Sequence, residues 1–222
     1  MHFVVTAGPT REHLDPVRFL SNPSTGRMGF EVARAAAAAG HDVELVAGPV
    51  SLRTPAGVRR VDVISARDML SAVEAALVRV RAGAVALVMT AAVADWRPAS
   101  RSPAKMKKSQ MDGALRLVRN PDILRTLDRE LPPRLKARLV RVGFAAETGD
   151  PASEAVRKCR EKGLDMVVAN DVSLPGSGFG TRTNKVDFVF PDGRVEHLPL
   201  MSKAAVARRI VALAAEICAV KR

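Results

Sequence analysis

The sequence contains few of the residues that build stacking surfaces or covalent cross-links. It has no tyrosine, one tryptophan (Trp96) and two cysteines (Cys159 and Cys218) among 222 residues. Proteins that bind single-stranded nucleic acid stack bases on exposed aromatic rings, so this composition argues against that class. Two widely separated cysteines provide neither a disulfide framework nor a metal-binding spacing. We therefore expect two free thiols on helices.

Long hydrophobic runs are also missing. No apolar stretch reaches the length of about 18 residues that a membrane-spanning helix needs. The N-terminus lacks the basic segment and apolar core of a secretory signal. With 47% hydrophobic residues, the chain can nevertheless bury a full core. We expect a cytoplasmic globular protein without a membrane partner, with residues 1–222 forming one domain.

Negative charge is scarce. The 23 acidic residues face 35 lysines and arginines, which gives a formal net charge of +12. This excess is typical of proteins that bind anions and leaves a basic nucleic-acid-binding module as an alternative. That alternative predicts strongly salt-dependent affinity for DNA or RNA and no turnover. The arginines are scattered, however, and an anionic small molecule accounts for part of the excess.

Segments with strand and helix patterns alternate along the chain. Apolar or alternating runs predict strands at 3–5, 41–47, 58–63, 84–89, 114–118, 137–145 and 164–169, and a hairpin at 185–190 and 194–198. Periodic apolar positions predict helices that end near residue 39 and that span 66–81, 120–129, 152–162 and 203–219. This order predicts an α/β fold with a Rossmann-like, doubly wound, mostly parallel sheet, a flap and a C-terminal β-hairpin.

The loop after the first strand is a candidate anion site. About 18 residues separate the strand from a helix that opens at Ser24-Thr25-Gly26-Arg27-Met28-Gly29, and loops of this length are usually functional. Free amides at a helix start, the hydroxyl groups of Ser24 and Thr25, and a glycine suit a phosphate. The alternative is a helix that merely carries its own serine cap. A nucleotide-sugar or NAD enzyme is disfavoured, because the glycine motif is incomplete and residues 47–49 lack the expected acid.

Two later segments carry charge that a nucleotide could use. Asp95 is the only acid in residues 90–98, which follow a central strand and should face the same crevice as the first loop. It could bind a sugar hydroxyl or a metal, or else cap a helix or pair with Arg97. Residues 99–113 are polar and basic and predict a mobile flap. Its Lys105-x-Lys107-Lys108 run could close over a triphosphate, or form a solvated surface.

Seven segments, in order and at compatible spacings, resemble the phosphopantothenate–cysteine ligase family, the synthetase half of the bacterial coenzyme A flavoprotein. They are TAGPTREHLDPVRFLSNPSTGRMG, AAVADWRP, KMKK, VRNPDIL, VGFAAET, KGLDMVVANDVS and GFGTRTNKV. The resemblance covers residue 3 to about residue 200. Because Met1 directly precedes the first strand, we expect a stand-alone ligase, with a separate flavin-dependent decarboxylase as a partner.

The resemblance implies a dimeric ligase that uses a nucleoside triphosphate and Mg²⁺. The carboxylate of 4′-phosphopantothenate attacks the α-phosphate, which gives an acyl nucleotidylate and pyrophosphate, and the amine of L-cysteine then displaces the nucleotide. Bacterial members usually use CTP and eukaryotic members ATP; the motifs here are bacterial in type, so CTP is expected and ATP is the alternative. The loop and hairpin at 173–200 are the candidate dimer contact.

The functional positions of the family carry over residue by residue. Asn22 matches the asparagine associated with the acyl nucleotidylate and its turnover, and Lys105 matches the essential lysine. The substrate-binding positions are Asn22, Ser24, Gly26 and Met28. The nucleotide-binding positions are Met89, Ala91, Ala92, Asp95, Lys105, Pro121, Asp122, Ile123, Leu124, Phe144, Lys158 and Lys162. The metal ligands are not assigned.

Four positions depart from the usual family residues. Pro23 replaces His, Thr25 replaces Ser, Arg27 replaces Lys and Met106 replaces Ile. Pro23 stiffens the loop beside Asn22, and Arg27 keeps its positive charge but presents a planar fork. These changes affect the expected substrate affinity and turnover. They leave open the alternative that the chain is an inactive nucleotide-binding homologue.

Overall fold

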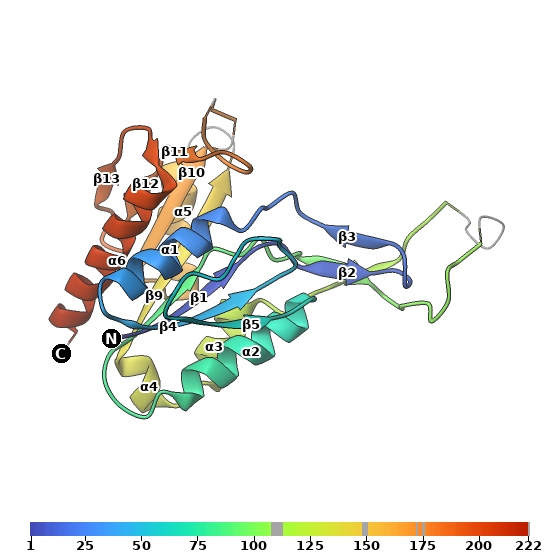
Figure 1. Ribbon diagram of the computed structural model, residues 1–222, viewed down its shortest axis with the longest axis horizontal. Coiled ribbons are helices and arrows are strands. Elements are labelled where there is room, and N and C mark those ends of the chain that lie inside the picture. The colour runs from blue at the N-terminus through green and yellow to red at the C-terminus, as the bar shows by residue number, and fades with distance from the viewer. Residues whose placement is uncertain (108–112, 148–150, 172, 175, 222) are drawn as a thin grey trace.

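The chain folds around a mostly parallel β-sheet flanked by helices (Figure 1). A computed structural model describes residues 1–107, 113–147, 151–171, 173–174 and 176–221. Within these residues the strand order of the central sheet is β13 (Val195–His197), β12 (Asp187–Val189), β10 (Met166–Asp171), β9 (Leu139–Glu147), β6 (Val85–Met89), β1 (His2–Ala7), β4 (Asp42–Ala47) and β5 (Val58–Asp62). The strands from β5 to β10 pair in parallel, and β12 and β13 pair antiparallel. This is the predicted Rossmann-like, doubly wound order.

Helices cover both faces of the sheet. One face carries α1 (Arg27–Ala38) and α6 (Lys203–Val220), and the other carries α2 (Ala66–Arg79), α3 (Ile123–Glu130), α4 (Pro133–Ala137) and α5 (Pro151–Lys162). Successive strand residues point to opposite faces, so Phe3 and Val5 pack in the α1 and α6 core while Val4 packs on the α2 side. A continuous apolar run is therefore the signature of these strands. Every helix in the described ranges is too short or too polar to cross a membrane.

Two small strand pairs form an arm, which comprises residues 11–21, 96–107 and 113–119. In it, β2 (Arg11–His13) pairs with β3 (Phe19–Ser21), and β7 (Trp96–Pro98) pairs with β8 (Leu117–Arg119). Figure 1 shows the β2–β3 hairpin of the arm running away from the helical layers. The prediction of one long loop after β1 was wrong, because the loop contains the β2–β3 hairpin. Lys108 and residues 109–112 of the predicted flap lie outside the described residues.

Other predicted elements need smaller corrections. The strand expected at 114–118 is β8, which is shifted toward the C-terminus by its pairing with β7. The helix expected from residue 120 begins at Ile123, because the Asp122 side chain accepts a hydrogen bond from the Arg125 amide and caps it. Helix α4 was not predicted, nor was the pair of β11 (Thr183–Asn184) with β14 (Met201–Ser202). The hairpin at 185–198 is confirmed as β12 and β13.

Both cysteines are buried free thiols on helices, as predicted. Cys159 lies on α5 and Cys218 on α6. Burial raises the pKa of the Cys159 thiol to about 11, and its Sγ lies 3.4 Å from the carbonyl oxygen of Val189. A thiol that stays protonated at neutral pH is a poor nucleophile, so we assign Cys159 a packing role.

Candidate active site

Two neighbouring cavities open where the carboxyl ends of β1, β6, β9 and β10 meet. The larger cavity has a volume of about 490 Å³ and is lined by residues from 89 to 162. The smaller cavity has a volume of about 130 Å³ and is lined by residues from 24 to 203. Ala91 and Phe144 line both. The cavities therefore adjoin beside β1 and β6, the point where the strand order reverses and where ligands of open α/β sheets bind.

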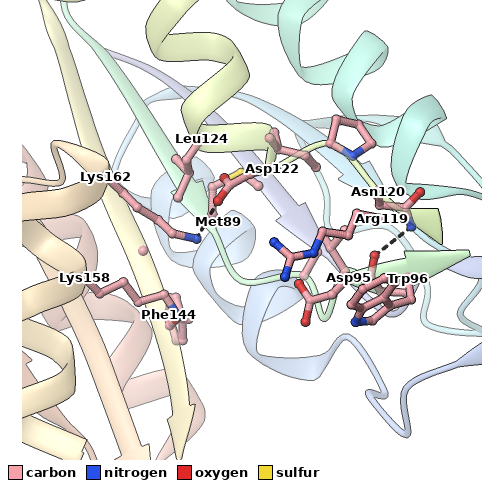
Figure 2. A pocket seen from close by; sticks show the side chains of 16 residues that line it. Met89, Asp95, Trp96, Arg119, Asn120, Asp122, Leu124, Phe144, Lys158 and Lys162 are labelled. Atoms are coloured by element: carbon pink, nitrogen blue, oxygen red, sulfur yellow. Dashed lines mark hydrogen bonds and ion pairs between the residues drawn. The ribbon is translucent and has the colours of Figure 1, made fainter. Parts of the chain in front are cut away.

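The larger cavity lies between α5 and the base of the arm. Figure 2 shows Lys158 and Lys162 on one side, with Asp95, Trp96 and Arg119 on the other. The predicted nucleotide-binding residues that line this cavity are Met89, Ala91, Asp95, Pro121, Asp122, Ile123, Leu124, Phe144, Lys158 and Lys162. Ala92 lines the smaller cavity instead, and Lys105 lines neither. Residues scattered over the sequence thus form one concave surface.

The two lysines of α5 are held by nearby oxygen atoms. Lys162 Nζ lies 2.9 Å from Asp122 Oδ2 (Figure 2), and Lys158 Nζ donates a hydrogen bond of 3.0 Å to the carbonyl oxygen of Phe144. Burial would raise the pKa of Asp122, but hydrogen bonds from Lys162 and from the Arg125 amide lower it below its usual value. Asp122 is therefore ionised at neutral pH, and it fixes Lys162 at the cavity wall.

Asn120 holds the turn that presents Asp95. Its amide nitrogen donates 2.8 Å to the Asp95 carbonyl, and its Nδ2 donates 2.7 Å to the Ala94 carbonyl (Figure 2). Arg97 donates to Asn120 Oδ1 at 3.2 Å and to the Arg119 carbonyl, so the alternative in which Asp95 pairs with Arg97 is wrong. The Asp95 carboxylate is exposed and makes no hydrogen bond or ion pair with the described part of the chain. It is available to a ligand in the larger cavity.

Trp96, Arg119 and Asn120 line the larger cavity but were not predicted as site residues. The guanidinium of Arg119 lies 5.2 Å from the centre of the Trp96 ring. Pairing of β7 with β8 brings them together from segments that are more than 20 residues apart. Trp96 lies in the AAVADWRP segment and Arg119 and Asn120 in the VRNPDIL segment, so the family resemblance was the available signal. That they lie together follows only from the strand pairing.

The smaller cavity lies at the start of α1. Ser24, Gly26 and Met28, which were predicted to bind substrate, line it. Gly26 has a φ of 76° and occupies the N-cap position, and no side chain caps the helix. The alternative of a self-capping serine was therefore wrong, since Ser24 Oγ accepts from the amide of Gly26 itself, at 3.3 Å, and not from an amide of the first helical turn. The first turn of α1 presents uncapped amides, which suit an anion.

Two cations face this cavity without a counter-charge. Lys203 is 5% exposed, and its Nζ donates 2.8 Å to the Gly178 carbonyl. Burial, and next the charge of Arg27, lower the pKa of Lys203. Arg27 Nε is buried and has no hydrogen-bond partner, and neither residue forms an ion pair with a described carboxylate. Buried positive charge that is left uncompensated is costly, so the cavity is built for an anion.

The site prediction missed Lys203, and it noted Arg27 only as a departure from the family residue. Both are the first residue of a helix, α6 and α1 respectively. The helix dipole disfavours a positive charge at this end, and local conflicts of this kind mark functional positions. A basic residue at a helix N-terminus was therefore the available signal.

Asn22 connects the first loop to the junction of the cavities. Its Nδ2 donates a hydrogen bond of 3.1 Å to the carbonyl oxygen of Ala92. The Ala92 amide in turn donates 2.9 Å to the Gly8 carbonyl. Asn22 therefore lies beside the wall that the larger cavity shares with the smaller one, where Ala91 lines both.

Gly29 allows α1 to approach β1, and we expect Gly29→Ala to destabilise the protein. A Cβ atom there would lie 2.5 Å from Thr90 Oγ1 and 2.7 Å from the Thr6 carbonyl oxygen. Helix propensity alone would favour alanine by about 1 kcal/mol, but overpacking should reverse the sign and cost about 2 kcal/mol. Urea unfolding measures the difference. The control is Ala38→Gly at the exposed end of α1, where the change in stability reflects helix propensity alone. If Gly29→Ala were more stable than the wild-type protein, the close packing described here would be contradicted.

Lys105 lies on the arm and lines neither cavity. Its side chain is exposed and makes no hydrogen bond or ion pair with the described residues. The candidate dimer contact at 173–200 contributes Gly178, Phe179 and Asn184 to the smaller cavity. The catalytic role of Lys105 and the dimer contact both stay predictions.

Comparison with known proteins gives one consistent family. Residues 1–217 match the model of the DNA/pantothenate metabolism flavoprotein C-terminal domain. The chain is 44% identical over 212 residues to the coenzyme A biosynthesis bifunctional protein CoaBC of Vibrio cholerae, covering 95% of this chain and 51% of that protein. It is 45% identical over 211 residues to CoaBC of Bacillus subtilis, covering 95% and 50%. The chain thus spans about half the length of these curated relatives.

Solved structures agree with this match. The crystal structure of the C-terminal domain of CoaBC is 38% identical, with a TM-score of 0.78, covering 97% of this chain and 95% of that one. A mutant of Cab2 in complex with phosphopantothenate-cysteine is 18% identical, with a TM-score of 0.79, covering 99% and 87%. At that identity the likeness to Cab2 concerns the fold alone.

Proposed function

The chain belongs to the DNA/pantothenate metabolism flavoprotein C-terminal domain family, and on that premise we propose that it joins L-cysteine to 4′-phosphopantothenate in coenzyme A biosynthesis. The observation that carries the proposal is the pair of adjoining cavities. One has the lining predicted for a nucleotide, and the other holds two uncompensated cations. A flavin-dependent decarboxylase would consume the product.

In this proposal the larger cavity holds CTP, with ATP as the alternative nucleotide. Asp95 would accept hydrogen bonds from the sugar hydroxyls, since its carboxylate has no partner in the described part of the chain. Lys158 and Lys162 lie on the opposite wall (Figure 2), where their ammonium groups can contact phosphate or base oxygen atoms. Arg119 adds a further cation on the Asp95 side.

Mg²⁺ would enter with the triphosphate. Among the described residues, no three His, Cys, Asp or Glu side chains come together to hold a metal. Mg²⁺ is commonly bound by substrate phosphates and water with few protein ligands, so the triphosphate itself would supply most of its ligands. The ion would neutralise phosphate charge as pyrophosphate leaves.

The smaller cavity would hold 4′-phosphopantothenate by its phosphate group. Arg27, Lys203 and the uncapped first turn of α1 offer a fork, a point charge and backbone amides to one dianion. The carboxylate at the other end of the substrate would then reach the junction lined by Ala91 and Phe144. The substrate would thereby span from the cations to the α-phosphate of the nucleotide.

The reaction would take place at this junction in two steps. The substrate carboxylate attacks the α-phosphorus, the bond to the bridging oxygen breaks, and pyrophosphate leaves. The amine of cysteine then attacks the acyl carbon, loses a proton, and releases the nucleoside monophosphate. The first step brings two anions together, so its transition state needs preorganised donors and cations. Lys105 and the first loop are the predicted source.

Pyrophosphate release by the purified chain tests the proposed function. The assay contains 4′-phosphopantothenate, cysteine and Mg²⁺, with CTP, ATP, GTP or UTP in parallel. Release that requires phosphopantothenate and is fastest with CTP is the expected result. If no nucleotide supports release, the chain is an inactive homologue or the basic binding module considered above, and a gel shift at two salt concentrations separates these two.

Asn22→Asp is expected to separate the two steps. The aspartate cannot donate to the Ala92 carbonyl, and its charge opposes the anionic intermediate at the junction. We expect pyrophosphate release in a first turnover to persist while cysteine addition slows about 100-fold. Quenched single-turnover assays would show the acyl nucleotidylate accumulating. Asn22→Ala removes the hydrogen-bond donor without adding charge, so the difference between the two variants measures the effect of the charge. Normal steady-state turnover of Asn22→Asp would contradict the proposed role of Asn22.

We further propose a homodimer, as in the family that the sequence resembles. The candidate contact at 173–200 borders the smaller cavity through Gly178 and Phe179, and Phe179 is 43% exposed. A contact there would place the partner beside the substrate. Light scattering distinguishes the 23.8 kDa monomer from a dimer.

A further inference from the structure

A buried acid in the turn between β2 and β3 reaches across the arm. Asp15 is fully buried. Its Oδ1 accepts hydrogen bonds of 2.8 Å from the amides of Val17 and Arg18, which close the turn. Its Oδ2 accepts from the Arg18 guanidinium at 2.6 and 3.0 Å, and also from the amide of Met106 at 3.3 Å. One carboxylate thus bonds both the turn and a segment 91 residues away.

Arg18 completes the connection from the other direction. Its Nη2 donates a hydrogen bond of 3.0 Å to the carbonyl oxygen of Met106. The amide of Met106 is bound by Asp15 and its carbonyl by Arg18, so both polar backbone groups of this residue are fixed. The Ser102 amide also donates 2.8 Å to the Leu14 carbonyl. The chain is therefore attached to the β2–β3 turn on both sides of Lys105.

Lys105 depends on these attachments for its place. Its side chain makes no hydrogen bond or ion pair of its own within the described ranges, and it lies on an arm that runs away from the sheet (Figure 1). A turn alone would need only the two amide bonds to Asp15 Oδ1. The second carboxylate oxygen and the Arg18 guanidinium bond each other, and each also bonds the backbone of Met106. Charged hydrogen bonds of this kind are the strong ones.

We propose that Asp15 and Arg18 are positioning residues that hold Lys105 for catalysis by fixing the backbone of Met106. The proposal rests on the proposed function, which gives Lys105 its role. Loss of either side chain would leave the lysine present but no longer directed, and a misplaced catalytic group costs rate more than affinity.

Kinetics and proteolysis of the full chain test the proposal together. For Asp15→Asn and for Arg18→Gln we expect kcat of pyrophosphate release to fall at least about tenfold, with the KM values for both substrates changed less than about threefold. We also expect endoproteinase Lys-C to cleave after Lys105 about ten times faster, because cleavage requires local release of the segment. Asp62→Asn, which breaks the exposed pair with Arg60, is the matched control and should change neither quantity.

A double-mutant cycle with Lys105→Gln separates positioning from a purely structural role. If Asp15 acts through Lys105, adding Asp15→Asn to Lys105→Gln lowers kcat no further, because coupled residues are non-additive. Additive losses, or a lower kcat without faster cleavage, would overturn the proposal, as would wild-type behaviour in both assays. If Asp15→Asn does not fold, Arg18→Gln carries the same readouts. If the wild-type chain releases no pyrophosphate, the proposed function fails, while the cleavage rates still decide whether the pair holds the segment.

Discussion

Lys105→Gln is expected to reduce pyrophosphate release about a thousandfold. The proposed first step joins two anions, and the removal of one preorganised charged donor from such a transition state typically costs two to three orders of magnitude, so about a thousandfold loss is the expected scale. Glutamine keeps most of the length and polarity of the side chain but not its charge. Because Lys105 is exposed and unpaired among the described residues, its replacement should leave the fold intact. Stopped-flow or coupled-enzyme assays measure the loss directly.

Arg101→Gln provides the matched control for this prediction. Arg101 is exposed on the same arm, and its replacement removes the same unit of charge. We expect its kcat to stay within about threefold of the wild-type value, because a general loss of electrostatic attraction is weak at exposed sites. Equal losses in the two variants would show that the arm contributes only its overall charge, and near-normal turnover of Lys105→Gln would remove the residue from the mechanism.

Lys203→Met is expected to abolish recognition of the substrate phosphate. Methionine fills a similar volume without charge, and a charged hydrogen bond in a buried site contributes enough for a loss of about 100-fold in kcat/KM for 4′-phosphopantothenate. Pantothenate, which lacks the phosphate, should react as slowly with the variant as with the wild type. The ratio of kcat/KM for the two substrates therefore falls, and KM for the nucleotide stays unchanged.

The free energy of unfolding distinguishes a loss of phosphate recognition from misfolding. Lys203→Met loses the hydrogen bond to the Gly178 carbonyl but also removes a buried charge, so we expect the free energy of unfolding to change by less than about 1 kcal/mol. Lys185→Met, at an exposed position, controls for the loss of one positive charge. If Lys203→Met still discriminates the two substrates as the wild type does, the phosphate binds elsewhere.

The sequence predicted the central sheet because burial on both faces leaves a strong local signal. Strands such as β1 and β6 are apolar at consecutive positions, and the apolar period of α2 is preceded by its Ser65 cap. Apart from the strand expected at 114–118, the arm left no such signal. Arg11-Glu12-His13 in β2 and Trp96-Arg97-Pro98 in β7 are polar or mixed, and they become strands only by pairing with β3 and β8. Pairing between distant segments is decided by the fold, not by neighbouring residues.

The candidate site was predicted only in part, for a similar reason. Asp95 could be placed from its position after a buried strand, and the start of α1 from its glycines. Lys203 looked like one more polar residue of an amphipathic helix, and only the fold brings it to Arg27. The same holds for Asp15, whose bonds to Met106 span 91 residues. Functional residues that are brought together by long-range contacts can be identified only from the three-dimensional structure.

The lining of the two cavities also sets an order in which a nascent chain can acquire them. The larger cavity is lined by residues up to Lys162, whereas the lining of the smaller one includes Lys203, 41 residues later. At a synthesis rate of roughly 5–20 residues per second, the ribosome covers that interval in about 2–8 seconds. During this time every residue that lines the larger cavity has been synthesised, while the smaller cavity still lacks its last cation. Translation therefore supplies the lining of the larger cavity first and that of the smaller cavity second.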